Sequence, residues 1–148
     1  MTTDYLAQHL QCSRTDKQDC LPMVQQLLEI AFFSRDHGLV ALDKFFNAEN
    51  SRFTDPFLRK AVSCLVDIAD AKMIRQVMYN YILAGNYTGS QFLRNLIIAD
   101  TILALHQKVD IDHIFSFLVP SYFGLEFDST VIDMYRNYAR TRNHNIEE

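Results

Sequence analysis

The chain has 148 residues, of which 49% are hydrophobic, and this size and composition are typical of one globular domain with its own core. Four glycines and three prolines are too few for a β-sandwich with many turns, so long helices are expected. The net charge of −4, without a cluster of basic residues, argues against a nucleic-acid partner, because phosphate contacts need concentrated lysine and arginine.

The start of the chain, MTTDYLAQHL, is neither basic nor followed by an apolar segment, and the most apolar run, FLRNLIIADTILAL, is interrupted by Arg94 and Asp100. We therefore expect a soluble, cytoplasmic protein without membrane insertion. The sparse cysteines also fit a reducing compartment. Cys12 and Cys20 are either a redox pair or two free thiols, whereas Cys64 lies in an apolar run and is expected in the core.

The first half of the chain predicts several helices in sequence. Residues 1–20 are polar and aperiodic, which predicts a partly ordered lead-in with room for one short helix. Pro22 stands at a favourable first helical position, and an apolar stripe continues to about residue 36. Gly38 marks a break or a C-cap, followed by a short helix over 39–48. Asp55 followed by Pro56 predicts a cap and a helix over about 55–68.

The second half predicts further helices. Asp70 caps the next one, which ends at Gly85. The segment 90–107 is apolar nearly all round, which predicts the central, buried helix. Asp110 or Asp112 begins a shorter helix that ends near Pro120, and the following PSYFGLEF is expected to be irregular. A last helix spans 128 to about 142, before a polar tail at 144–148. We therefore predict one all-α domain over 21–143, a bundle of about six or seven helices.

Dense aromatic residues mark the segment from Phe115 to Phe127. They either cover one end of the bundle, because large aromatics dominate cores, or expose an apolar patch for a partner or a second copy of the chain.

The sequence contains no motif that predicts catalysis. His106, Asp110, Asp112 and His113 are the best candidates for a metal site, but they lack the HxxxH spacing, and capping explains the two aspartates better. Neither a nucleophile elbow nor a phosphate-binding loop is present. We expect no enzyme activity, metal or cofactor. The stretch LALHQK leaves one alternative open, a signalling module that uses His106 for phosphotransfer or a small-molecule pocket between helices.

Two stretches resemble the cytoplasmic region of the MotA family, the stator subunits of the bacterial flagellar motor. They are GLVALD, residues 38–43, and DPFLRKAVSCLVDIADAKMIRQVM, residues 55–78. The second matches the family pattern without a gap at Asp55, Pro56, Phe57, Leu58, Arg59, Lys60, Val66, Asp67, Asp70, Ile74 and Arg75. The chain departs from the family in lacking its four membrane helices and in carrying Ile68 and Ala71 where the family has glycine and proline. Channel and torque activity are therefore not implied.

The resemblance implies a contact surface for a flagellar rotor protein such as FliG. In the family, a basic residue before the glycine and an acidic residue at the end of the motif face the rotor, and Arg35 and Asp43 stand at these positions. On a continuous helix they would be about 12 Å apart and could share a face. Arg59 and Lys60 are either a solvated face or an extension of this surface. We expect a non-enzymatic interaction module associated with motility. The sequence also leaves open that the chain forms a homo-oligomer. The other interpretation of Arg35 and Asp43 is that they are solvated residues at helix ends.

Overall fold

Helices make up 84% of the protein in a computed structural model that describes residues 3–9 and 12–147, and those residues contain no strand. The α-helices are α1 (Thr3–His9), α2 (Arg14–Phe46), α3 (Pro56–Asp67), α4 (Ala71–Gly85), α5 (Gly89–His106), α6 (Ile111–His113), α7 (Val119–Phe123) and α8 (Asp128–Glu147). A π-helical turn, η1 (Ile114–Leu118), joins α6 to α7, and a 3₁₀ turn, η2 (Leu125–Phe127), precedes α8. The prediction of an all-α bundle is confirmed.

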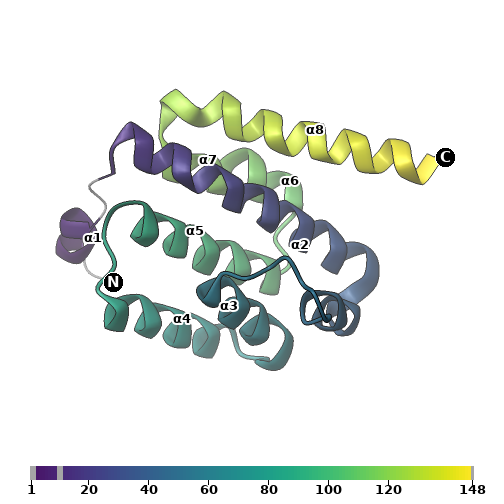
Figure 1. Cartoon of the computed structure of the whole chain (residues 1–148), viewed down its shortest axis with the longest axis horizontal. Coiled ribbons are helices and arrows are strands. Elements are labelled where there is room, and N and C mark those ends of the chain that lie inside the picture. Colours follow the sequence, from purple (N-terminus) through teal and green to yellow (C-terminus); the bar gives the residue numbers. More distant parts are fainter. Residues whose placement is uncertain (1–2, 10–11, 148) are drawn as a thin grey trace.

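Helix α5 is the centre of the bundle. It lies between α2 on one side and α3 and α4 on the other, and it contacts all three as well as α7 (Figure 1). Its buried side chains cover the whole circumference and are mostly apolar: Phe92, Leu93, Asn95, Leu96, Ile97, Ile98, Ala99, Thr101, Ile102, Leu103 and Ala104. The prediction that the helix without a polar face is the buried one is confirmed. Within the described ranges, no helix combines the length and apolarity needed to cross a membrane.

Helix α2 begins well before the predicted start at Pro22. Ser13 caps it through a capping box, in which the Ser13 side chain accepts from the backbone N–H of Asp16 and the Asp16 side chain accepts from the N–H of Ser13. Pro22 therefore lies inside the helix, where it cannot donate to the carbonyl of Gln18. Gln18 and Pro22 are both exposed, so solvent can satisfy that carbonyl. The predicted start was wrong because a stronger cap lies upstream.

Pro120 does not end its helix, and the predicted irregular segment after it is helical. The turn before the proline widens into η1, where the N–H of Val119 donates to the carbonyl of Ile114, five residues earlier. The chain then continues through α7 to Gly124, and α8 extends to Glu147, past its predicted end near residue 142. Across this region, Phe115, Phe123 and Phe127 are buried, whereas Phe117 is 70% exposed. Most of the aromatic segment is therefore core.

Two predicted helix caps are confirmed. The Asp55 side chain accepts from the N–H of Leu58 at 2.9 Å, with Pro56 at the first helical position of α3. The Asp70 side chain accepts from the N–H of Lys72 at 3.1 Å and begins α4.

We predict that Asp55→Ala lowers the free energy of unfolding by about 1 kcal/mol, because an N-cap acceptor is lost. Asp55 also lies 3.7 Å from the guanidinium of Arg94. Asp55→Asn keeps the capping oxygen and removes this ion pair, so it should cost much less. Urea denaturation of the two variants separates the contributions, and equal losses would show that the ion pair, rather than the cap, stabilises this end of α3.

Candidate functional site

Helix α2 is kinked at Gly38. The backbone there has φ 85° and ψ 172°, a conformation essentially restricted to glycine. The kink separates a long first part from a short second part, residues 39–46, which is held in place by the buried side chains of Leu42 and Phe46. The predicted break is confirmed, and the chain is helical on both sides of it.

Arg35 precedes the kink and is paired within the protein. Its Nε donates to Oδ1 of Asp36 at 3.0 Å, and its guanidinium lies 4.6 Å from the centre of the Phe32 ring. Arg142 of α8 donates to the second carboxylate oxygen of Asp36. Burial opposes the charge on Asp36, but the hydrogen bonds from Arg142 and Arg35 outweigh it and hold the pKa of this carboxyl below its usual value. Asp36 thus ties α2 to α8.

Asp43 lies beyond the kink, so it does not share one straight helical face with Arg35. Its Oδ1 accepts from Nδ2 of Asn47 at 2.9 Å, and Oδ1 of Asn47 accepts from Nη2 of Arg59 at 3.1 Å. Arg59 also donates to the backbone carbonyl of Phe53 at 2.7 Å. The structure therefore joins Asp43 and Arg59, through Asn47, in a network that holds the loop between α2 and α3.

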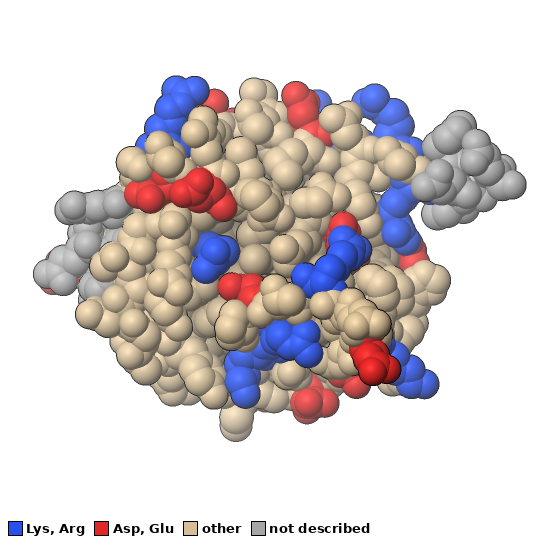
Figure 2. Space-filling view, viewed as in Figure 1, with Lys and Arg blue, Asp and Glu red and all other residues tan. Residues whose placement is uncertain are grey.

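Lys60 is exposed on α3, and its ammonium lies 5.6 Å from the centre of the Tyr81 ring of α4. Of the four predicted contact residues, Asp43 and Arg59 are brought together, Arg35 pairs with Asp36, and Lys60 extends over α4. On the face shown in Figure 2, lysine and arginine alternate with aspartate and glutamate, and neither sign forms a continuous patch.

Exposed apolar residues lie on the second part of α2. Val40 is 72% exposed, and Leu39 is 39% exposed. Lys44 is also exposed, on the same face as Val40 because it is one helical turn further on. We call Leu39, Val40 and Lys44 the corner surface. The sequence predicts a helix over 39–48 but does not predict that Val40 is exposed. The i, i+4 spacing of Leu42 and Phe46 is the signal that identifies the buried face.

A pocket of about 900 Å³ opens beside the kink. It is enclosed by α2 around Gly38, the end of α3, the end of α5 and the segment that leads into α6. Arg35 and His106 both line it. The Nδ1 atom of His106 is buried and has no hydrogen-bond partner in the described part of the chain. His106 is half-buried, so a phosphotransfer reaction at this residue would have to use its other ring nitrogen, Nε2.

The predicted metal candidates have other partners. Asp110 caps α6 by accepting from the N–H of Asp112 at 2.9 Å, and Asp112 accepts from the Tyr135 hydroxyl at 2.9 Å. The ring of His113 lies 6.1 Å from that of Phe117. The described residues contain no group of three or more histidines, cysteines, aspartates or glutamates arranged to hold a metal ion.

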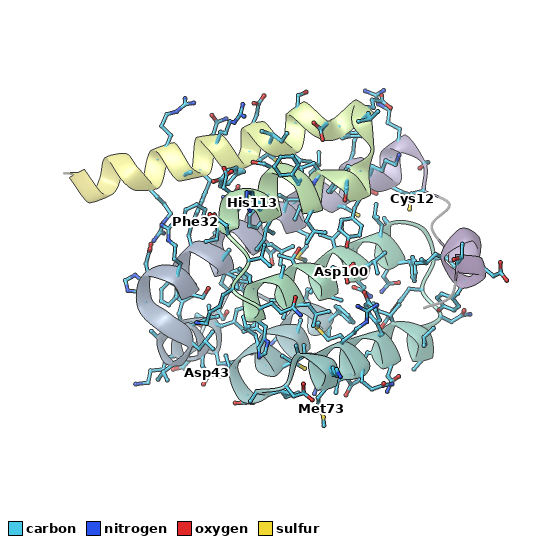
Figure 3. The ribbon with its side chains drawn as sticks, turned by 180° about the vertical axis from the view of Figure 1, so that it is seen from behind. Cys12, Phe32, Asp43, Met73, Asp100 and His113 are labelled. Atoms are coloured by element: carbon cyan, nitrogen blue, oxygen red, sulfur yellow. The ribbon has the colours of Figure 1, made fainter. Side chains whose placement is uncertain are left out.

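A half-buried polar cluster lies between α4, α5 and α7. The Asp100 carboxylate accepts from the hydroxyls of Tyr79 and Tyr122, one on each oxygen. Burial, together with the negative charge of Asp100, raises the pKa of both tyrosines, so both remain hydrogen-bond donors at neutral pH. Figure 3 shows Asp100 in the middle of the molecule, between helices. The sequence indicated Asp100 only as an interruption in an apolar run, and its partners lie too far along the chain to be predicted.

The cysteines are free thiols. Cys12 donates to the carbonyl of Gly89 at 3.4 Å, and Cys20 donates to that of Ser90 at 3.3 Å. Burial raises the pKa of Cys20 to about 12. A thiol with so high a pKa is a poor nucleophile, so the structure favours the interpretation as structural thiols that tie the start of α2 to the start of α5.

Comparisons of the chain with protein-family models, with curated proteins and with solved structures found no match. The resemblance to the MotA cytoplasmic region therefore depends on the two sequence stretches alone.

We predict that Gly38→Ala lowers the free energy of unfolding by about 1–3 kcal/mol, because alanine is strained at this backbone conformation. A Cβ at position 38 would meet no atom within 4 Å, so steric crowding cannot contribute. Urea denaturation measures the loss, with His37→Ala at the preceding exposed position as the control. An unchanged stability would mean that α2 passes position 38 with a negative φ.

We predict that Asp36→Asn makes the free energy of unfolding less dependent on pH in the acidic range. Folding lowers the pKa of Asp36. The ionised Asp36 therefore adds to the free energy of unfolding at pH values above its pKa in the unfolded chain, and this stabilisation is lost as the pH falls through its pKa in the folded protein. The free energy of unfolding of the native sequence should therefore fall more steeply than that of the variant between about pH 5 and pH 2. Asp133→Asn, at an exposed position of α8, is the control, and parallel curves for all three proteins would contradict the pairing.

Proposed function

We propose that the protein is a non-enzymatic protein–protein interaction module whose contact surface is the corner surface, Leu39, Val40 and Lys44, with Arg35 at its edge. The observation that carries the proposal is the exposure of Val40, 72%, beside Leu39 and the positive charge of Lys44. Interfaces combine an apolar centre with a polar rim, and a helix that exposes aliphatic side chains beside charges has this composition.

The resemblance supports the same surface. The stretch that resembles the MotA family begins at Gly38 and includes Leu39 and Val40, which lie on the exposed side of the second part of α2. A flagellar rotor protein such as FliG is therefore the first partner to test, and the module would act in the cytoplasm. Because Asp43 and Arg59 hold the adjoining loop, we assign them the role of shaping the surface, and Lys60 of α3 would extend it toward α4.

Reversing the charge of Lys44 is a clearer test of the contact than reversing that of Arg35. Reversing Arg35 would also break its pair with Asp36, whereas Lys44 has no carboxylate within ion-pair distance in the described ranges. A change in binding on reversal of Lys44 can therefore be assigned to the partner.

We predict that Val40→Glu weakens binding of FliG about tenfold or more, because it places a charge in the apolar centre of the contact. Lys44→Glu should cost about 1 kcal/mol or less, and less at high salt. Titration calorimetry measures binding, and thermal melting should be unchanged because both positions are exposed.

The matched control is Met73→Glu. Met73 is 53% exposed and points outward from α4, away from the corner surface (Figure 3). An equal effect of Met73→Glu would show that the weakening is not specific to the corner surface. If FliG does not bind the native chain, the flagellar assignment is wrong.

A further inference from the structure

The pocket beside the Gly38 kink has the size of a small-molecule site. Its volume of about 900 Å³ lies within the range of roughly 300–1,000 Å³ that is usual for such sites. Four segments distant in the sequence form its walls, so the kink in α2 and the ends of α3 and α5 are all needed to enclose it.

The walls are aliphatic. The apolar lining includes Leu39, Leu65, Val66, Ile68, Leu105 and Val109. Among the described residues that line the pocket, the imidazole of His106 is the only aromatic ring, so a flat ligand would find little stacking surface there. This lining suits a flexible alkyl chain better than a nucleobase or a flavin.

The polar groups of the lining favour an anionic head group. Arg35 uses its Nε for Asp36 and retains its terminal nitrogens as donors. Lys108 lines the pocket and has no ion-pair partner in the part of the chain that the structure describes. Two carboxylates, Asp67 and Asp110, also line the pocket, and both oppose an anion there, although one oxygen of Asp110 is occupied by the cap of α6.

Lys108 has an unusual backbone conformation. It follows the C-cap of α5 with φ 59°, and its N–H donates to the carbonyl of Leu105 at 3.1 Å. Glycine is the usual residue at such a left-handed position, because other residues are strained there. The N–H of Val109 donates to the carbonyl of Ala104 at 3.0 Å, so the two hydrogen bonds form a Schellman motif, and Lys108 takes its left-handed position at the end of α5.

We propose that this pocket binds an aliphatic carboxylate. The alkyl chain lies against the aliphatic wall, and the carboxylate accepts hydrogen bonds from Lys108 and Arg35. This site shares Arg35 and Leu39 with the proposed protein contact, but binding of a carboxylate does not require a protein partner.

The test uses decanoate as the probe, with the full chain, by titration calorimetry. Lys108→Gly should weaken decanoate binding about tenfold, the effect of losing one charged hydrogen bond. The same substitution should leave the melting temperature equal or higher, because glycine relieves the strain at this position. Lys72→Ala, at an exposed position of α4 outside the pocket, is the control and should bind decanoate as the native chain does.

A second pair of variants, similar in size but different in charge, tests whether the pocket prefers an anionic head group. Val109 lines the pocket and is 40% exposed, so a polar side chain can be placed there without disturbing the core. Val109→Asp should weaken decanoate binding more than the neutral Val109→Asn does, because it adds a repelling carboxylate.

Three results would overturn the proposal. The first is the absence of decanoate binding to the native chain. The second is binding of decanol or decyltrimethylammonium as tightly as decanoate, which would show that the pocket does not select an anion and, in the cationic case, that Asp67 or Asp110 is the anchor. The third is unchanged affinity of Lys108→Gly.

Discussion

The burial of α5 is the constraint on which the rest of the fold depends. A helix with apolar side chains on every side must be covered on every side, and α2, α3, α4 and α7 do this. Each covering helix needs only one apolar face. This arrangement explains why α3 and α4 are amphipathic while α5 is not. The half-buried Asp100 is paired with two hydroxyl donors, which offset the cost of partly removing its carboxylate from water.

The kink at Gly38 follows from the same constraint. The first part of α2 lies along α5, and the chain must then turn toward the start of α3. Burial of Leu42 and Phe46 orients the second part, and the Asp43–Asn47–Arg59 network fixes the loop that follows. One glycine therefore creates both an exposed corner and the pocket beside it, because a straight helix would provide neither.

The two candidate sites share this corner but differ in chemistry. The corner surface combines exposed aliphatic side chains with a lysine, which suits a protein partner. The pocket is concave, aliphatic and lined by potential donors, which suits a small anion. Leu39 and Arg35 stand beside both. The pairing of Arg35 and Arg142 with Asp36 holds this part of α2 against α8, so the geometry of both sites depends on an interaction between segments far apart in the sequence.

The sequence by itself determined the features that arise from interactions between near neighbours. Asp55 with Pro56 and Asp70 identified two helix starts, because a cap acts within three residues of its own position. The unbroken apolar character of α5 identified the central helix. The tertiary structure decided the rest. Whether Gly38 ends or bends a helix depends on what buries the residues after it, and glycine allows both. The partners of Arg35, Asp43 and Asp100, and the enclosure of the pocket, depend on contacts between distant segments, which local sequence patterns do not encode.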